Sequence, residues 1–257
     1  MNDFPIIFSD VDGTILDFEN YSYKISLPAI RALAGKGIPL ILVSSKTYRE
    51  MLKLHKRIKL PWPFIFENGA GIAQHGTYTL YGKTYQELLQ YKPAIEQACG
   101  KITWADNLSL TKLSEYTGLP TRKVKDMMAR MASLLCIAPH TLDIKKINKQ
   151  LHPFGIAITT GGKFFTVIDS NVNKGSAVQM IQAMYRQHYT TIYSYAIGDG
   201  LNDADMFNAV DEAYFVGKRN IFKNIQTLCP VIHKSKKEGP GGFCEVIDRI
   251  VKDYSLT

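Results

Sequence analysis

Short apolar runs alternate with amphipathic helical patterns in the first part of the chain. The segments "PIIF", "IPLILV" and "PFIF" are rich in β-branched and aromatic residues, which is typical of strands buried on both faces. Between them, residues 27–35 and 48–58 carry apolar residues at helical spacing. Ser26 is expected to cap the first helix, and Thr47 with Glu50 forms a capping-box pattern before the second. This strand-helix alternation predicts a parallel sheet covered by helices.

The middle of the chain has a different pattern. A hairpin is predicted at Gly76, several helical patterns follow, and two later strand patterns are separated by a Gly-Gly pair, which is typical of antiparallel sheets. From Lys174 onward the alternation of helices and apolar strands resumes. We therefore predict an α/β fold with a Rossmann-like parallel sheet core, formed by residues 1–83 and 173–257 and interrupted by an α+β domain at residues 84–172.

Charge and composition limit the class of protein without selecting a function. The chain has 257 residues, 46% of them hydrophobic, and a formal charge of +8. Residues 84–172 hold half of that excess, and such a charge suits nucleic acid, an anionic membrane or a small acidic ligand. The densest basic run, "RKVK", has the spacing of a solvated helix face, which argues against a nucleic-acid patch.

The cysteines and apolar segments indicate a cytoplasmic protein without a membrane partner. Four widely spaced cysteines without a C-x-x-C pair favour free thiols in a reducing compartment. The first residues lack the basic segment of a signal peptide, and "IPLILV" is too short to cross a bilayer. The sequence does not indicate the oligomeric state.

Polar residues follow several of the predicted strands. Asp10 and Asp12 follow the first strand, Ser44 follows the second, and "GDGLND" at residues 198–203 follows "YSYAI", while Lys174 begins a helix. Ligands of open α/β sheets collect beyond the carboxyl ends of the strands, so these groups are expected to converge. Taken singly, "VDG" and "GDGLND" are ordinary turn and helix-cap signals, and only their combination points to a site.

The chemistry of this set favours a hard cation and a phosphoryl group. Carboxylates brought together repel one another, and a ligand set of oxygens without His or Cys favours Mg²⁺. A carboxylate can attack a phosphoryl group once the charge of that group is neutralised, which Mg²⁺ and Lys174 would do. Phosphoryl transfer through Asp10 uses every member of the set.

Four motifs, "DVDGT", "SSKT", "NKGSA" and "GDGLND", occur in the order of the motifs of the haloacid dehalogenase superfamily, which the chain resembles. The insertion resembles the C2-type cap domain of the sugar-phosphatase branch, subfamily IIB. The resemblance implies that Asp10 is the nucleophile and a metal ligand. It implies that Asp12 is the general acid and base, with its backbone carbonyl facing the metal. An acid at this second position separates phosphatases and phosphomutases from dehalogenases.

The resemblance also assigns the remaining motif residues. Ser44 and Lys174 would hold the transferring phosphoryl group. Asp199 would ligate Mg²⁺, and Asp203 would support the metal site directly or through water.

Further stretches resemble the mannosyl-3-phosphoglycerate phosphatases of this superfamily, namely "SSKT", "ENGAGI", "TGLP", "GGKFF" and "GPGGF". This resemblance implies a small acidic substrate that carries a phosphorylated sugar or glycoside and a carboxylate. Lys163 stands where the family more often has Arg, and Phe243-Cys244 where it more often has Trp-Asn. Arg grips a carboxylate with two parallel hydrogen bonds and Lys does not, so the substrate stays open.

Candidate substrate-binding residues lie at a turn and at strand ends. The stretch "TTGGK" offers hydroxyls, amides and the Lys163 amine to an anion, and an ordinary hairpin with a solvated lysine explains it equally well. Glu67 and Asn68 are expected to reach the sugar or the cap, or to brace a loop. The candidates are Glu67, Asn68, Thr159, Thr160, Lys163 and Asn202.

Other functions stay open at this point. A phosphohexomutase of the same fold would return the phosphoryl group to a sugar, and a sugar phosphatase of another specificity would share the chemistry. A nucleic-acid-binding module that uses the basic insertion would leave the acidic residues and the lysine without a purpose.

Overall fold

The computed structural model describes residues 3–254, which pack as two compact units. The first unit comprises residues 3–44, 58–65 and 174–254, and the second comprises residues 45–57 and 66–173. The cap boundaries expected from the sequence, at 84 and 172, stay a prediction.

Six parallel strands form the sheet of the first unit. Their order is β12-β11-β10-β1-β2-β3. Strands β1, β2 and β3 are buried almost throughout, as strands covered on both faces must be. The predicted Rossmann-like α/β fold is confirmed. The strands are β1 (Phe4–Ser9), β2 (Leu40–Val43), β3 (Phe64–Phe66), β10 (Ile192–Gly198), β11 (Glu212–Phe215) and β12 (His233–Lys234).

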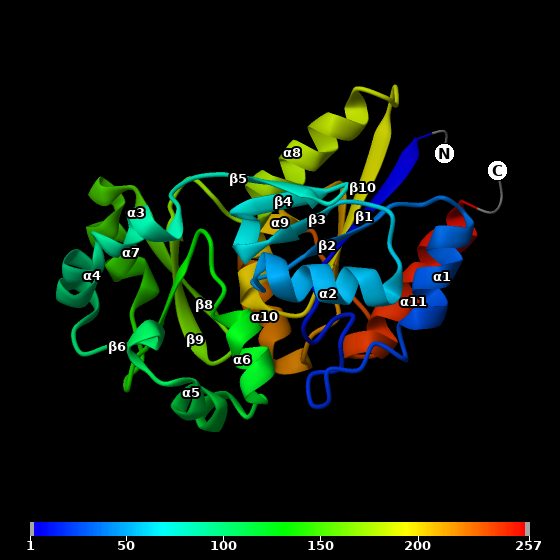
Figure 1. The fold of residues 1–257 in the computed structure, drawn as a ribbon. Helices are drawn as coiled ribbons and strands as arrows, with labels where there is room; N and C mark the ends of the chain where they lie inside the picture. The colour runs from blue at the N-terminus through cyan, green and yellow to red at the C-terminus, as the bar shows by residue number, and fades with distance from the viewer. Residues whose placement is uncertain (1–2, 255–257) are drawn as a thin grey trace. The chain divides into compact units, whose positions relative to one another are not determined.

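Helices cover both faces of this sheet. Figure 1 shows α1 and α11 together on one side of β1 and β10, with α8, α9 and α10 on the other side. Helix α10 has no counterpart among the elements predicted from the sequence. The helices are α1 (Leu27–Gly35), α8 (Lys174–Arg186), α9 (Ala204–Phe207), α10 (Arg219–Leu228) and α11 (Gly239–Asp253), with a 3₁₀ turn η4 (Leu201–Asp203) before α9.

The two predicted helix caps have different outcomes. Ser26 does not cap α1, because its Oγ is buried and donates to the carbonyl of Ile15 at 2.8 Å. Thr47 and Glu50 do form the predicted capping box before α2 (Tyr48–Ile58). The Glu50 carboxylate accepts from the Thr47 amide at 3.0 Å, and the Thr47 hydroxyl accepts from the Glu50 amide at 3.2 Å. The expectation for Ser26 is wrong because its backbone is helical, with φ of −77° and ψ of −18°, whereas a capping residue has an extended backbone.

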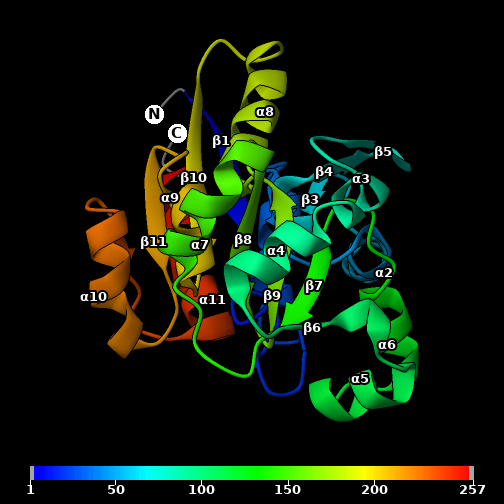
Figure 2. The ribbon, with the colours of Figure 1, turned by 90° about the vertical axis from the view of Figure 1, so that its left-hand side faces the viewer.

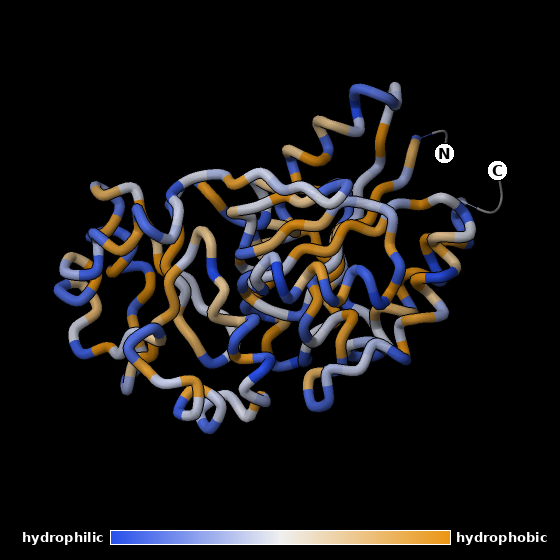
Figure 3. Tube along the Cα trace, viewed as in Figure 1, coloured by the Kyte–Doolittle hydropathy of each residue, from blue (hydrophilic) through white to orange (hydrophobic). Residues whose placement is uncertain are grey.

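An antiparallel sheet of order β6-β7-β9-β8 forms the core of the second unit. One face packs on α4 and α7, which lie side by side in Figure 2, and the other packs on α5 and α6. Figure 3 shows apolar residues concentrated along the strands. The elements are α3 (Tyr85–Leu89), α4 (Lys92–Cys99), β6 (Thr103–Trp104), η2 (Ala105–Asn107), α5 (Leu110–Thr117), α6 (Thr121–Met127), β7 (Leu134–Ile137), α7 (Ile144–Leu151), η3 (His152–Phe154), β8 (Ile156–Gly161) and β9 (Phe164–Asp169).

A hairpin and a 3₁₀ turn complete the second unit. Strands β4 (Gly71–Gln74) and β5 (Thr77–Leu80) pair antiparallel across His75 and Gly76, which both have positive φ, so the predicted hairpin is confirmed. The turn η1 (Glu67–Gly69) precedes β4.

The four cysteines are free thiols, as predicted. Between residues 3 and 254, no helix combines the length and the apolar character that a membrane span requires.

Candidate active site

The parallel register brings three of the predicted residues to one edge of the first unit's sheet. Ser9 lies opposite Leu42 of β2 and Ile197 of β10, so these three strands end at nearly the same level. Asp10, Ser44 and Asp199 are the residues that follow β1, β2 and β10 there, and the Asp10 and Ser44 side chains are buried. The topology therefore gathers groups that are far apart in sequence.

Lys174 joins two carboxylates at this edge. Its side chain is only 2% exposed, and its Nζ donates to Asp10 Oδ1 and to Asp203 Oδ1, each at 2.6 Å. Lys174 is the first residue of α8. A buried ammonium that contacts two carboxylates forms a charge-assisted network closed to solvent.

Asp203 organises the loop after β10. Its Oδ2 accepts from the amides of Asp199 at 3.1 Å and Gly200 at 3.0 Å, while Oδ1 accepts from Lys174. The residue is fully buried, and both of its oxygens are engaged. Because both oxygens already accept hydrogen bonds, Asp203 is better suited to orient the other groups of a metal site than to be the main ligand of the ion.

Gly13 permits the close approach of Asp199 to the loop after β1. Its φ is +77°, and a Cβ placed on it would lie 2.3 Å from Asp199 Oδ2. Any side chain at this position would collide with the carboxylate and adopt an unfavourable backbone conformation. The glycine of "DVDGT" is thus required by the geometry of the site, a role that the sequence pattern alone did not reveal.

Asp10, Asp199 and Asp203 form a group that fits a divalent cation. Each offers one carboxylate oxygen, and these oxygens all lie within 4.8 Å of one another. Within residues 3–254, no other group of three or more His, Cys, Asp or Glu side chains has this spacing. Oxygen-only donors fit Mg²⁺ better than softer metals.

The electrostatics of the site also favour a cation. Burial raises the pKa of Asp10 well above its usual range against the opposing effect of Lys174, and the neighbouring carboxylates raise it further. Burial and Asp203 raise the pKa of Asp199 to about 7. Burial acts to lower the pKa of Lys174, but Asp10 and Asp203 outweigh it and leave that pKa above its usual value. The Lys174 ammonium therefore stays charged. One ammonium does not balance the charges of Asp10, Asp199 and Asp203, so a bound cation would be favourable here.

Other residues of the first unit lie in the same two loops. Asp12 is half-buried in the loop after β1, and Asn202 is half-buried in η4. Thr14, which the sequence reasoning did not single out, is fully buried, and its hydroxyl has no hydrogen-bond partner among the described residues. Its position within the "DVDGT" motif could have identified Thr14 as a candidate site residue.

In the second unit, Lys163 bonds to the end of α5. Its Nζ donates to the carbonyls of Tyr116 at 3.0 Å and Thr117 at 3.2 Å, and the Tyr116 hydroxyl donates to the Lys163 carbonyl at 2.8 Å. The structure thus joins the "TGLP" and "GGKFF" stretches. Thr159 and Thr160 lie in β8, before the same turn. The substrate-binding role of these three residues stays a prediction.

Glu67 and Asn68 are buried in η1. The Glu67 carboxylate accepts hydrogen bonds from residues 131–133, all within the second unit. Their predicted contact with substrate stays a prediction, and these bonds favour the alternative in which Glu67 braces a loop.

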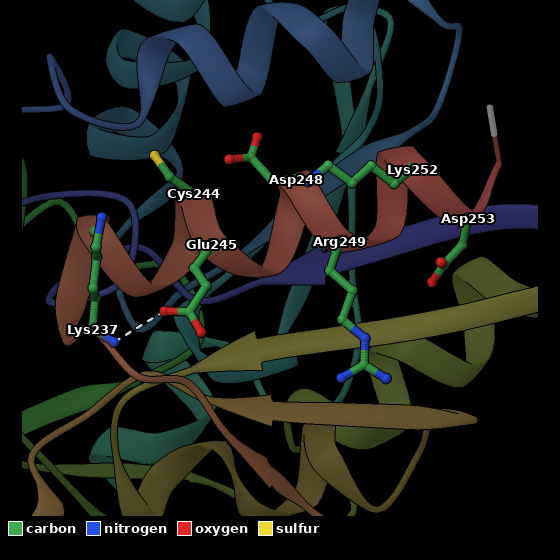
Figure 4. A pocket seen from close by; sticks show the side chains of 8 residues that line it. Lys237, Cys244, Glu245, Asp248, Arg249, Lys252 and Asp253 are labelled. Atoms are coloured by element: carbon green, nitrogen blue, oxygen red, sulfur yellow. Dashed lines mark hydrogen bonds between the residues drawn. The ribbon is translucent and has the colours of Figure 1, made fainter.

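A shallow pocket lies along α11 (Figure 4). It measures about 440 Å³ and is lined mainly by charged side chains, among them Glu245, Asp248 and Arg249. None of the predicted site residues lines it. It therefore carries no part of the chemistry described above.

Comparison with known proteins agrees with the motifs. The family of haloacid dehalogenase-like hydrolases matches residues 7–102 and 106–247. Two proteins named glucosyl-3-phosphoglycerate/mannosyl-3-phosphoglycerate phosphatase are similar over nearly their full length. The one from Persephonella marina is 29% identical, with 96% of this chain and 97% of that protein covered. The one from Methanococcoides burtonii is 30% identical, with 98% and 99% covered.

A solved structure shares the fold. The haloalkanoate-superfamily phosphatase BT1666 from Bacteroides thetaiotaomicron superposes with a TM-score of 0.69 at 14% identity, covering 100% of this chain and 97% of its own. The superfamily predicted from the four motifs is confirmed. The chain belongs to the family of haloacid dehalogenase-like hydrolases.

Proposed function

We propose that this protein is a Mg²⁺-dependent phosphatase that hydrolyses a phosphorylated sugar or glycoside through an aspartyl-phosphate intermediate. The observation that carries the proposal is the buried Lys174, whose amine contacts Asp10 and Asp203 beside the carboxylate of Asp199. The names of the two relatives support mannosyl-3-phosphoglycerate as the substrate, with mannosylglycerate and phosphate as products.

The metal site of this proposal uses the oxygens at the sheet edge. Asp10, Asp199 and the backbone carbonyl of Asp12 would hold Mg²⁺, with Asp203 in support directly or through water. When bound there, the ion would offset the negative charge of the carboxylates and of the phosphoryl oxygens.

In the first step, a carboxylate oxygen of Asp10 attacks phosphorus. The bond between phosphorus and the sugar or glycerate oxygen breaks, and Asp12 donates its proton to the departing oxygen. Ser44 and Lys174 hold the phosphoryl oxygens during the transfer. Lys174 also favours the ionised, nucleophilic form of Asp10 against the opposing effect of burial.

In the second step, Asp12 acts as a base. It takes a proton from water, whose oxygen attacks phosphorus and releases inorganic phosphate. Asp10 regains its carboxylate and Asp12 its proton, so the cycle closes without another reactant.

Substrate selection is proposed to depend on the charge of the insertion and on a small set of polar residues. The excess of 11 Lys or Arg over 7 Asp or Glu in residues 84–172 suits a substrate with a phosphate and a carboxylate. We place the enzyme in the cytoplasm, where its free thiols would stay reduced. The proposed contacts are Asn68, Thr159, Thr160, Lys163 and Asn202, while Glu67, whose carboxylate accepts bonds from residues 131–133, takes the alternative role of bracing that loop.

A panel of phosphorylated sugars and phosphoglycerate glycosides, assayed for phosphate release with and without Mg²⁺, tests the proposal. We expect steady release from mannosyl-3-phosphoglycerate that needs Mg²⁺ and no bisphosphate activator. Transfer of the phosphoryl group to a second sugar position without release would identify a mutase. Salt-sensitive binding of duplex DNA that survives Asp10→Asn, with no turnover of any ester, would favour the nucleic-acid alternative.

A further inference from the structure

A segment of the second unit, residues 126–133, is bonded to three distant stretches of chain, one of which is Tyr85, whose amide donates to the Met131 carbonyl at 2.6 Å. This segment, here called the clasp, connects the end of α6 to β7. It contacts residues 45–53, which surround the start of α2, and Glu67, which starts η1. In the sequence, these stretches directly follow Ser44 and β3.

Glu67 forms the first attachment. Its Oε1 accepts from the Met131 amide at 2.9 Å, and its Oε2 accepts from the Ala132 amide at 3.0 Å and from the Ser133 hydroxyl. The residue is 0% exposed. A carboxylate that is sealed from solvent and holds three donors would have to break these bonds to contact a sugar.

Arg130 and Asp126 form the second attachment. The Arg130 guanidinium donates to the carbonyl of Ser45 at 3.1 Å and to the Ser133 hydroxyl at 3.0 Å. The backbone carbonyl of Asp126 accepts from the Thr47 hydroxyl at 2.8 Å. Ser133 therefore bonds both to Glu67 and to Arg130, and Arg130 bonds in turn to the residue after Ser44.

The backbone conformation at Glu67 indicates that surrounding contacts hold this residue in place. Glu67 has φ of 47° and Asn68 has φ of 58°, in the left-handed region that side chains other than glycine rarely occupy. Such conformations persist where the surrounding contacts hold them. The Glu67 amide also donates to the Lys46 carbonyl at 2.8 Å, which links η1 to the start of α2 directly.

We propose that Glu67 is a positioning residue that acts through the clasp on the stretch after Ser44. Its carboxylate holds residues 131–133 in place. Arg130 bonds both to Ser133 and to the Ser45 carbonyl, so it connects these residues to Ser45. Because Ser45 is covalently bonded to Ser44, its position limits where the Ser44 hydroxyl can lie. The inference rests on the proposed function only for the role of Ser44 in holding the phosphoryl group.

The inference also extends the proposed substrate recognition. The clasp belongs to the chain between α6 and β7, within the insertion that carries the candidate substrate residues of the "TTGGK" turn. Strand β7 pairs with β9, and β9 pairs with β8, which contains Thr159 and Thr160. One buried carboxylate thus ties the sheet of the insertion to the stretch that follows Ser44.

Hydrogen exchange in three variants tests this chain of contacts. Glu67→Gln keeps the side-chain size, but it removes the charge and replaces one acceptor oxygen with an NH2 donor. We expect the Met131 and Ala132 amides to exchange at least about tenfold faster, because a charge-assisted hydrogen bond is lost. A peptide spanning residues 44–50 should also exchange faster. Arg130→Gln should affect that peptide alone and leave the amides of Met131 and Ala132 protected.

Asp143→Asn is the matched control. Asp143 accepts a similar bond from the Lys146 amide at 3.1 Å in the second unit, but this bond lies at the start of α7 and involves no residue of the clasp. It should change neither region. Calorimetric titration with orthovanadate in the presence of Mg²⁺, which needs no turnover, should show about tenfold weaker binding for Glu67→Gln and Arg130→Gln only.

The outcomes separate this inference from the proposed function. If residues 44–50 keep their exchange rates in both Glu67→Gln and Arg130→Gln, the clasp does not position that stretch and the inference fails. If Glu67→Gln does not fold, Arg130→Gln decides alone. If every variant shows the expected exchange but the wild type hydrolyses no phosphate ester, the positioning stands and the phosphatase proposal fails.

Discussion

Replacement of Lys174 by methionine should destabilise the first unit strongly when Mg²⁺ is absent. The variant keeps the length of the side chain but removes the charge between Asp10 and Asp203. Loss of one partner from a buried ion pair costs about 3–5 kcal/mol. Lys174 is 2% exposed and lies 2.6 Å from both carboxylates, so we expect the upper end, about 5 kcal/mol.

Urea unfolding provides the measurement. With a slope of about 3 kcal/mol per molar urea, a loss of about 5 kcal/mol lowers the midpoint by about 1.7 M. Trp62 lies in the first unit and Trp104 in the second, so a Trp104→Phe background lets fluorescence report the first unit. Lys234→Met is the control, because the Lys234 amine donates to the carbonyl of Gly217, and it should cost less than about 1 kcal/mol.

Two conditions should reduce the loss caused by Lys174→Met. Lower pH protonates the buried carboxylates, and since the pKa values of Asp10 and Asp199 are already raised, the effect should begin near neutrality. Mg²⁺ at about a hundred times its dissociation constant should restore up to about 2.7 kcal/mol. A loss below about 1 kcal/mol at pH 7 without Mg²⁺ would refute the reasoning, because the ion pairs would then not be buried as described.

Three further variants test separate parts of the account. Asp12→Asn should lower kcat by at least about a hundredfold because it removes the general acid and base, and a change in Mg²⁺ affinity alone would contradict that role. Gly13→Ala should weaken Mg²⁺ binding at least about tenfold in a calorimetric titration, because its Cβ would meet Asp199 Oδ2 at 2.3 Å; unchanged affinity would place Asp199 elsewhere. Asp169→Asn should destabilise the second unit by about 2 kcal/mol at pH 7 in thermal unfolding. Burial acts to raise the pKa of Asp169, but hydrogen bonds from Asn171 and Lys83 lower it below its usual value, so the difference from wild type should vanish as the pH falls below the usual Asp range. A difference that persists at low pH would exclude a contribution from the charge.

The parallel sheet was predictable because its strands are apolar on both faces. Segments such as "PIIF" and "IPLILV" have no polar face that could contact solvent, so helices must cover both faces of the sheet. Helix α10 was missed although Ile221, Ile225 and Leu228 stand at helical spacing, so the sequence did contain its signal. Strand β6 has two residues, too few for a periodic signal. Ser26 could not be judged locally, because its hydroxyl partner is Ile15, eleven residues away.

The candidate site was predictable where motifs and topology agree. Asp10, Lys174 and Asp203 were identified as residues next to predicted strands and helices, and the parallel register brings them into contact. The partners of Glu67 depend on how the loop before β7 folds back, and no local pattern in residues 126–133 encodes that contact. Lys163 was predicted either to face an anion or to lie in an ordinary hairpin, and the sequence did not indicate the bonds of its amine to carbonyls at the end of α5. Such contacts arise from tertiary packing and not from spacing along the chain.

The most direct test of the account is chemical trapping of the phosphorylated carboxylate. An acyl phosphate is reduced by borohydride to the alcohol, so enzyme quenched during turnover of a phosphorylated sugar and then reduced should yield homoserine at residue 10. Peptide mass spectrometry locates the product. Homoserine at position 10 is the predicted result; homoserine at another aspartate, or none while phosphate is released steadily, would contradict the assignment of Asp10 as the phosphoryl acceptor.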